Sequence, residues 1–241
     1  RITRTVFTRN AMLEGISYPV EYEIDLEEPM AAELVALWHF NEENWTADQA
    51  GDVQDSVGTY HGMPKGGANT TSGLFDKSGI FDGDTDWINF SDIPIPSSSN
   101  FSVSFWSKTP TSVAGHLTFF RQGDTPNRLI LYASTTYGTA SNQLRLYMEG
   151  EVCVGSDFRD GLWHHITLTR AGNDFTVYKE KNIDCSGPSA TTVGQMNFQI
   201  ATRPSDYYNG SIDEFAIWNR TLTKEEIKSL YERGRAKLNF Q

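Results

Sequence analysis

Short segments in which apolar and polar residues alternate, separated by turn-forming residues, run through most of this chain. Phe101–Trp106 alternates most regularly and places Phe101, Val103 and Phe105 on one side of an extended strand. Further strands are predicted at Leu34–Phe40, Leu117–Arg121, Arg128–Tyr132, Gln143–Glu149, His164–Thr169 and Phe175–Lys179. Many short strands at this spacing, with turn signals between them, indicate an antiparallel sandwich or barrel.

Two regions depart from the strand pattern. Thr223–Arg233 is helical, with an N-cap threonine and Glu226 three residues later, which is a capping box. Residues 1–33 begin with a basic stretch and continue into Tyr18–Leu26, which alternates like a strand with one acidic face. We therefore expect an N-terminal connector or added strand, residues 1–33, followed by a sandwich domain, residues 34–241.

Composition narrows the classes of partner. The 241 residues include Phe 14, Tyr 10 and Trp 6, a balance that favours strands over long helices. A formal net charge of -11 argues against nucleic acid, because duplex binding draws on clustered lysine and arginine. No apolar run approaches 18 residues, so we expect no direct membrane insertion. The chain begins at Arg1, and we expect it to belong to a larger surface protein or assembly.

Two cysteines, Cys153 and Cys185, lie in separate predicted strands. A disulfide between them would close a loop of about 30 residues and stabilise the fold by roughly 3 kcal/mol. Two buried free thiols fit the sequence equally well, because spacing alone does not establish connectivity.

Adjacent carboxylates, Asp213 and Glu214, interrupt the apolar strand Gly210–Trp218. Burying a carboxylate is costly unless it is paired, hydrogen-bonded or bound to a metal. Calcium, a hard cation with oxygen ligands, is one partner that would satisfy it. Alternatively, the two side chains cap turns or pair with Arg220 or Lys224.

The phrase from Gly210 to Ile227 resembles the closing signature of laminin G-like modules in the concanavalin A-like lectin/glucanase superfamily. Five more phrases follow the family's order: Leu34–Glu42, Asp55–Gly62, Phe81–Gly83, Phe101–Trp106 and Trp163–Ile166. The resemblance covers Leu34 to Gly234. It implies an all-β, antiparallel β-sandwich (a jelly roll) with its first and last strands side by side and one short C-terminal helix.

By the same resemblance, the loop after the first strand lies beside the last long strand. This implies a calcium site made by Asn41, Glu42, Asp55 and Asp213. The family often has aspartate where Asn41 stands and a Gly-Asn-Gly turn where Val57–Thr59 stands, so this sequence departs from the family at both places.

Aromatic residues in polar loops are candidates for stacking on sugars. Tyr207 and Tyr208, beside Asp206 and Asn209, form the best such pair and are our predicted ligand-binding residues. Packing of one ring against the edge of the sandwich is the alternative.

Together these features predict a non-catalytic, calcium-binding recognition or adhesion module of an extracellular or cell-surface protein, with a glycan or protein ligand. A structural or displayed domain of a surface assembly, such as a filament, is the alternative. A third hypothesis is a glycan-cleaving enzyme that uses Glu23 and Glu27, which share one face of a strand. We disfavour it because this segment precedes the sandwich and also fits a solvated acidic face.

Overall fold

The computed structural model describes residues 7–13, 16–22, 28–92, 94–97, 99–111, 116–135, 142–203 and 206–238. The chain divides into two compact units, Arg1–Glu33 and Leu34–Gln241. The first unit contains the antiparallel strands β1 (Phe7–Leu13) and β2 (Ile16–Tyr22) and a single helical turn, α1 (Glu28–Ala31). Glu23 and Glu27 lie outside the described residues, so the structure does not test the glycosidase hypothesis.

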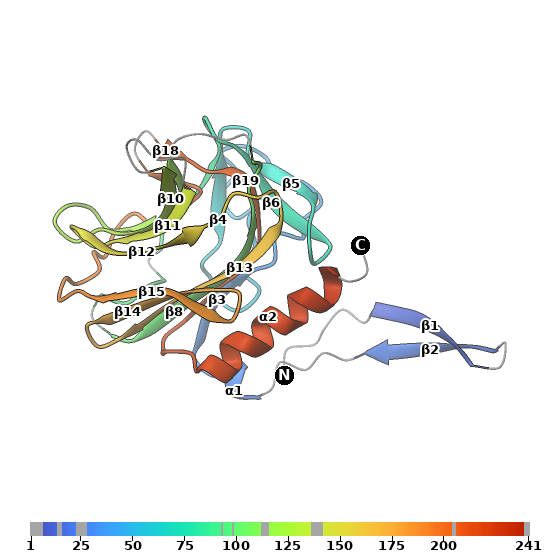
Figure 1. Ribbon diagram of the computed structural model, residues 1–241. Coiled ribbons are helices and arrows are strands. Elements are labelled where there is room, and N and C mark those ends of the chain that lie inside the picture. The colour runs from blue at the N-terminus through green and yellow to red at the C-terminus, as the bar shows by residue number, and fades with distance from the viewer. Residues whose placement is uncertain are drawn as a thin grey trace. The chain divides into compact units, whose positions relative to one another are not determined.

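The second unit is a sandwich of two antiparallel sheets (Figure 1). The seven-stranded sheet has the order β12 (Glu151–Asp157), β11 (Asn142–Tyr147), β10 (Leu129–Thr135), β9 (His116–Gln122), β16 (Gln199–Ile200), β7 (Trp87–Phe90) and β4 (Gly62–Lys65). The eight-stranded sheet has the order β15 (Asn182–Pro188), β14 (Asp174–Lys179), β13 (Trp163–Ala171), β8 (Phe101–Lys108), β19 (Asn209–Trp218), β6 (Lys77–Asp82) and β5 (Asn69–Ser72), with β3 (Leu34–Trp38) also paired to β19. Two short strands, β17 (Thr202–Arg203) and β18 (Asp206–Tyr207), pair with each other. The predicted all-β antiparallel sandwich is confirmed.

The first and last strands of the sandwich lie side by side, as the resemblance implied. Trp38 in β3 is opposite Phe215 in β19. Their side chains enter a core of aromatic rings, in which Phe105 and Phe215 stack with ring centroids 5.1 Å apart. Each such ring contributes roughly 1.5–3 kcal/mol by leaving water. A one-residue slip would turn these rings outward, so the core fixes the register of both strands.

Helix α2 (Lys224–Leu238) covers part of the outer side of the eight-stranded sheet. The predicted capping box is confirmed: the amide of Glu226 donates to Thr223 Oγ1 (3.2 Å), and the amide of Thr223 donates to Glu226 Oε2 (2.8 Å). The helix continues to Leu238, beyond the predicted end at Arg233. No helix in the described part of the chain is long and apolar enough to cross a membrane.

A disulfide joins Cys153 in β12 to Cys185 in β15, with their Cα atoms 5.7 Å apart. These are edge strands of the two sheets. Beside the bridge, the Ser156 amide donates to Asp184 Oδ2 (2.9 Å), and Gly155 leaves the space that this carboxylate fills. The bridge and the hydrogen bond therefore close one side of the sandwich.

A substitution at Gly234 tests how closely α2 packs on the sheet, because a Cβ at this position would overlap the ring of Trp106. Alanine favours a helix over glycine by about 1 kcal/mol, but overpacking against a fixed ring costs about 1–3 kcal/mol, and the overlap at Gly234 with the ring favours the upper part of that range. We expect Gly234→Ala to lower the melting temperature by up to roughly 8 °C in thermal denaturation. Gly150, whose added Cβ meets nothing within 4 Å, is the matched control. An unchanged or higher melting temperature for Gly234→Ala would contradict this packing.

Candidate functional site

Asp213 and Glu214 lie where β19 changes its pairing partner. Asn209–Ile212 pairs with β6, whereas Phe215–Trp218 pairs with β3. Between these segments the register with β8 shifts at a bulge, and Glu214 has a φ of 52°. This left-handed conformation is costly for a residue with a side chain, so neighbouring contacts must maintain it.

Asp213 is fully buried and holds the turn that precedes β6. Its Oδ2 accepts hydrogen bonds from the amides of Leu74 (2.8 Å) and Phe75 (2.9 Å). Gly73 permits the approach, because a Cβ there would lie 2.8 Å from the same oxygen. Asp213 thus ties this turn to the last strand.

Glu214 connects three elements through a hydrogen bond with His39 and an ion pair with Arg233. Its carboxylate contacts His39 Nδ1 at 2.5 Å and Arg233 Nη2 at 2.9 Å, so the residue following β3, the bulge of β19 and helix α2 meet here. The guanidinium of Arg233 also lies 5.1 Å from the centre of the Phe75 ring. The alternative partner expected from the sequence, Arg220, instead pairs with Glu226 at 2.7 Å.

The two adjacent carboxyl groups have opposite pKa shifts. Burial, followed by the negative charge of Glu214, raises the pKa of Asp213 well above its usual range. Burial also acts to raise the pKa of Glu214, but His39 and Arg233 outweigh it and hold that pKa below its usual value. Glu214 therefore carries the negative charge of the pair, and Asp213 is the member that favours the protonated form.

The other expected calcium ligands have protein partners. Asp55 is buried, and its carboxylate accepts four amide hydrogen bonds at 3.0–3.1 Å, from Leu37, Val57, Gly58 and Tyr60. It therefore organises its own loop and secures the free edge of β3.

Glu42 and Asn41 are engaged in a similar way. Glu42 accepts from the Gln54 amide (2.9 Å) and from Trp45 Nε1 (3.0 Å), and Asn41 Oδ1 accepts from the Lys77 amide (3.0 Å). Among the expected ligands, Asp213 Oδ1 is buried with no hydrogen-bond partner in the described part of the chain.

The structure does not test the predicted calcium site. Calcium takes six to eight oxygen ligands, which include backbone carbonyls and waters. Within the described residues, no group of three or more His, Cys, Asp or Glu side chains could hold a metal ion. Calcium binding therefore stays a prediction that rests on the family resemblance.

The two predicted ligand-binding tyrosines differ. Tyr208 is fully buried, and its hydroxyl lies 2.9 Å from Thr109 Oγ1 and donates to the carbonyl oxygen of Lys108 (3.2 Å). The expectation that Tyr208 exposes its ring is therefore wrong: the ring belongs to the core, and polar groups around the hydroxyl compensate its burial. Tyr207 is half-buried, and its role in ligand binding stays a prediction.

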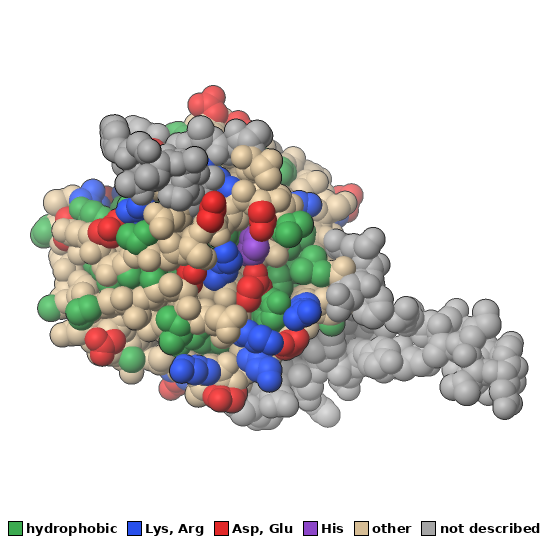
Figure 2. All heavy atoms as spheres, in the orientation of Figure 1, with side chains coloured by type: hydrophobic (Ala, Val, Ile, Leu, Met, Phe, Trp, Pro, Cys, Tyr) green, Lys and Arg blue, Asp and Glu red, His purple; other side chains and the backbone are tan. Residues whose placement is uncertain are grey.

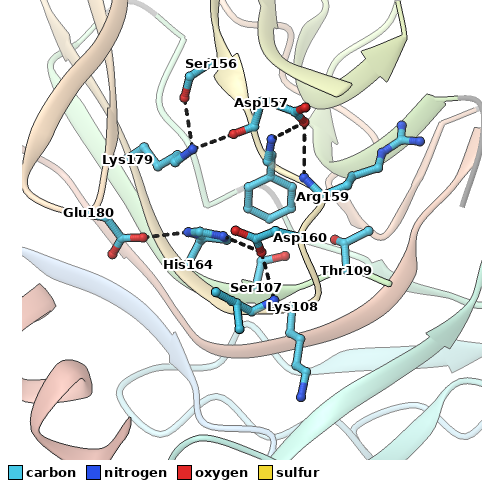
Figure 3. Close-up of polar contacts among 12 residues, drawn as sticks. Ser107, Lys108, Thr109, Ser156, Asp157, Arg159, Asp160, His164, Lys179 and Glu180 are labelled. Carbon is cyan, nitrogen blue, oxygen red and sulfur yellow. Dashed lines mark hydrogen bonds and ion pairs between the residues drawn. The ribbon is translucent and has the colours of Figure 1, made fainter. Parts of the chain in front are cut away.

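A second polar cluster lies at the start of β13 (Figure 3). His164 is nearly buried between two carboxylates, with Nδ1 2.7 Å from Glu180 Oε1 and Nε2 2.9 Å from Asp160 Oδ1. Both ring nitrogens can donate in the imidazolium form alone. Burial acts to lower the pKa of His164, but Glu180 and Asp160 outweigh it and raise the pKa above its usual value. This cluster fastens the β12–β13 loop to the β14–β15 turn.

The outer face of the seven-stranded sheet carries a cross-strand row of mostly polar residues, in which Ile130 and Arg121, near the middle, are buried and Tyr147, Gln199 and Asn89 are half-buried. The alternate positions, such as Leu144, Leu146 and Ile88, belong to the core, so the residues between them point away from it. Successive registers align one residue from each strand: Glu151, Tyr147, Ile130, Arg121, Gln199, Asn89 and Met63. We call this set the outer-face row.

Hydrogen bonds hold the middle of the row in place. Arg121 Nε donates to Gln199 Oε1 (2.6 Å), and Gln199 Nε2 donates to Asn89 Oδ1 (3.3 Å). At one end, Arg128 Nη2 donates to the hydroxyl of Tyr147 (3.1 Å), and its guanidinium carbon lies 5.2 Å from the centre of that ring. These side chains are fixed before any ligand arrives.

Acidic partners neutralise the arginines in and beside the row. Arg128 contacts Glu149 through Nε (2.9 Å) and Nη2 (3.2 Å), and Arg121 Nη1 contacts Asp124 (3.1 Å). The hydrogen bond to Glu149 raises the pKa of Arg128, and the hydrogen bond from Arg128 lowers the pKa of Glu149.

Half-buried aromatic rings stand near both ends of the row. Tyr147 lies in it on β11, and Trp87 is two residues from Asn89 on the same face of β7. Aromatic faces and fixed amide and guanidinium groups offer a hydroxyl-rich ligand both apolar contact and hydrogen bonds. The two carboxylates nearest the row, Glu149 and Asp124, are held by arginines.

Sequence reasoning missed the outer-face row. A local signal existed: Gln143, Arg145 and Tyr147 alternate with Leu144 and Leu146. However, their alignment with Asn89 and Gln199 depends on strand order and register, which the local pattern does not specify.

Two packed antiparallel sheets, joined through their first and last strands and bearing this polar face, define a jelly-roll sandwich of the lectin type. The chain belongs to the concanavalin A-like lectin/glucanases superfamily, because its laminin G-like family model matches residues 82–228. The fold expected from the sequence resemblance and the family itself are thereby confirmed.

Two solved structures show the same fold. Domain 4 of AbnA, an extracellular GH43 arabinanase from Geobacillus stearothermophilus, was solved in complex with arabinotriose; it has 20% identity and a TM-score of 0.66, and the match covers 83% of this chain and 98% of that one. A structure of botulinum neurotoxin type C, whose cell entry depends on two ganglioside molecules, has 12% identity and a TM-score of 0.63 and covers 86% of this chain and 52% of that one.

A curated relative matches by sequence. The sushi, von Willebrand factor type A, EGF and pentraxin domain-containing protein 1 of Rattus norvegicus is 24% identical over 155 residues. The match covers 56% of this chain and 4% of that protein, so this chain corresponds to a small part of its relative.

Asp213 gives the first test of this site. Alanine would leave two amides without an acceptor, at about 1–3 kcal/mol each, so we expect Asp213→Ala to cost roughly 2–6 kcal/mol in chemical denaturation. Asp213→Asn keeps an acceptor oxygen and the neutral form that the raised pKa favours, so it should cost much less. Wild-type melting in calcium and in chelator tests the calcium prediction, and equal curves would leave Asp213 as a hydrogen-bond acceptor alone. A calcium-dependent rise that Asp213→Ala removes would instead establish the metal site.

His164 gives a test that depends on pH. Its folded pKa is raised above the unfolded value of about 6.5, so its stabilisation is complete below that pH and is lost as pH rises through the folded pKa. His164→Gln should therefore cost about 2 kcal/mol near pH 5.5 and less near pH 9. The wild type and the variant share His165, whose pKa burial lowers to about 4, so its contribution cancels. A pH-independent difference would show that His164 is not charged in the folded protein.

Proposed function

We propose that the sandwich is a non-catalytic glycan-binding module whose ligand lies on the outer face of the seven-stranded sheet. The supporting observation is the outer-face row itself, in which Arg121, Gln199 and Asn89 are hydrogen-bonded in series. Groups already fixed in place lose little conformational freedom on binding, which favours affinity. Tyr147 adds a half-buried ring at one end.

The relatives support a glycan as the ligand. The arabinanase domain holds arabinotriose, and botulinum neurotoxin type C depends on gangliosides, which also present sugars. These similarities favour a glycan as the ligand. Because one fold serves many functions, the position of the binding site rests on this chain's own residues.

The disulfide between Cys153 and Cys185 supports an extracellular or cell-surface setting, since such bridges persist in oxidising compartments. An adhesion or recognition role within a larger surface protein is consistent with this setting. Calcium binding stays a proposal of the resemblance, with Asp213 as its candidate ligand, and no step of glycan binding depends on it.

Glycan-array binding by the whole chain, followed by variants of the row, tests this function. Tyr147→Ala removes the ring, and Gln199→Ala breaks the hydrogen-bonded series, so we expect each to weaken glycan binding at least tenfold. Tyr207→Ala, at the site expected from the sequence, is the matched control and should bind like the wild type.

Three other outcomes would redirect the assignment. Loss of binding in Tyr207→Ala alone would move the site to β18. A folded wild-type protein that binds no glycan would favour the structural or displayed domain. Release of reducing sugar, lost in Glu23→Gln and Glu27→Gln, would establish the enzyme.

A further inference from the structure

We infer that the ligand of the outer face is an uncharged, extended oligosaccharide longer than a disaccharide. This inference rests on the proposed glycan-binding function and deepens it. The two solved relatives differ in the charge of the glycan in their names, because arabinotriose is neutral whereas gangliosides are anionic.

The cationic side chains of this face, in the described residues, each have an acidic partner. Such pairs are present at Arg121 with Asp124, Arg128 with Glu149, Arg145 with Glu151 and Lys65 with Asp48. A carboxylated or sulfated sugar would have to displace one of these carboxylates or lie beside it. Like charges brought together across an interface are costly, so the pairs discriminate against anionic ligands.

The rest of the molecule adds to this discrimination. The formal net charge is -11, so the long-range field repels anions. On the surface in view in Figure 2, lysine and arginine side chains lie among aspartate and glutamate side chains rather than in a patch of their own. The segments that precede β9 and follow β10, residues 112–115 and 136–141, contain no lysine, arginine or histidine.

The polar groups that remain available are neutral donors. Gln199 Nε2 uses one of its two hydrogens on Asn89, and the Nδ2 group of Asn89 donates to no group in the described part of the chain. The hydroxyl of Tyr147 accepts from Arg128 and keeps its own hydrogen. These donors match the hydroxyl and ring oxygens of an uncharged sugar.

The spacing of the two aromatic rings sets the minimum length of the ligand. From β11 to β7 the sheet crosses β10, β9 and β16, so four strand spacings separate Tyr147 from Asn89. At about 4.8 Å per spacing, and with Trp87 two residues further along its strand, the two rings stand roughly 20 Å apart. A single sugar ring cannot contact both, so a chain of several sugars is required to reach the two rings across the buried Ile130 and Arg121.

Isothermal titration of the whole chain tests both parts of the inference. The probes are neutral arabino-, xylo- and cello-oligosaccharides of two to six residues, with sialyllactose and oligogalacturonate as anionic probes. We expect a neutral series to bind with a dissociation constant that falls at least tenfold from the dimer to the tetramer. That constant should be the same at about 0.05 M and about 0.5 M sodium chloride, because screening acts on charge pairs. Trp87→Ala should remove the gain in affinity with length.

A charge-releasing variant makes the test specific to the acidic partners. Glu149→Gln frees Arg128, whose side chain is 32% exposed, so this variant should gain salt-sensitive binding of the anionic probes. Tighter wild-type binding of an anionic probe, lost in Tyr147→Ala, would overturn the inference and keep the proposed function. Equal affinity for the dimer and the hexamer would overturn the length requirement. No binding to any probe would contradict the proposed function itself.

Discussion

The sandwich depends on two adjacent carboxyl groups in its last strand, one neutral by preference and one charged. Removing one partner of a buried ion pair typically costs about 3–5 kcal/mol, a large part of a total stability of about 5–15 kcal/mol. Glu214, paired with His39 and Arg233, fixes the bulge at which β19 leaves β6 and joins β3. Because β19 is central to its sheet, the position of this bulge sets the register of β3 and the position of α2. The register of these strands in turn places the aromatic rings of the core, against which the opposite sheet packs.

Carboxylates also accept hydrogen bonds from backbone amides in loops, where these amides have no partner in a neighbouring strand. Asp55 accepts four amides of its loop, and Asp82 accepts the amides of Asp84, Thr85 and Asp86. Buried backbone donors must find acceptors, and a carboxylate supplies several in one side chain. Asp55 and Asp82 therefore have a structural role in the loops that contain them.

Local sequence information determined the fold but not the binding surface. Alternation in Phe101–Trp106, the capping box at Thr223 and the ordered family phrases each report on neighbouring residues, and each was confirmed. Tyr208 was misjudged because its polar neighbours suggested exposure, whereas those groups satisfy its buried hydroxyl. The outer-face row was missed because it joins Met63, Tyr147 and Gln199, whose proximity exists only after three-dimensional pairing.

The paired arginines of the outer face have a consequence for selectivity. An unpaired guanidinium would attract any anion, and the attraction would fall with salt. Once a carboxylate holds it, as Glu149 holds Arg128, the guanidinium becomes a rigid polar support for Tyr147 rather than a charge offered to the ligand. In the proposed glycan complex, discrimination would then depend on the positions of neutral donors and rings along the row, because a wrong ligand would leave those fixed donors unpaired.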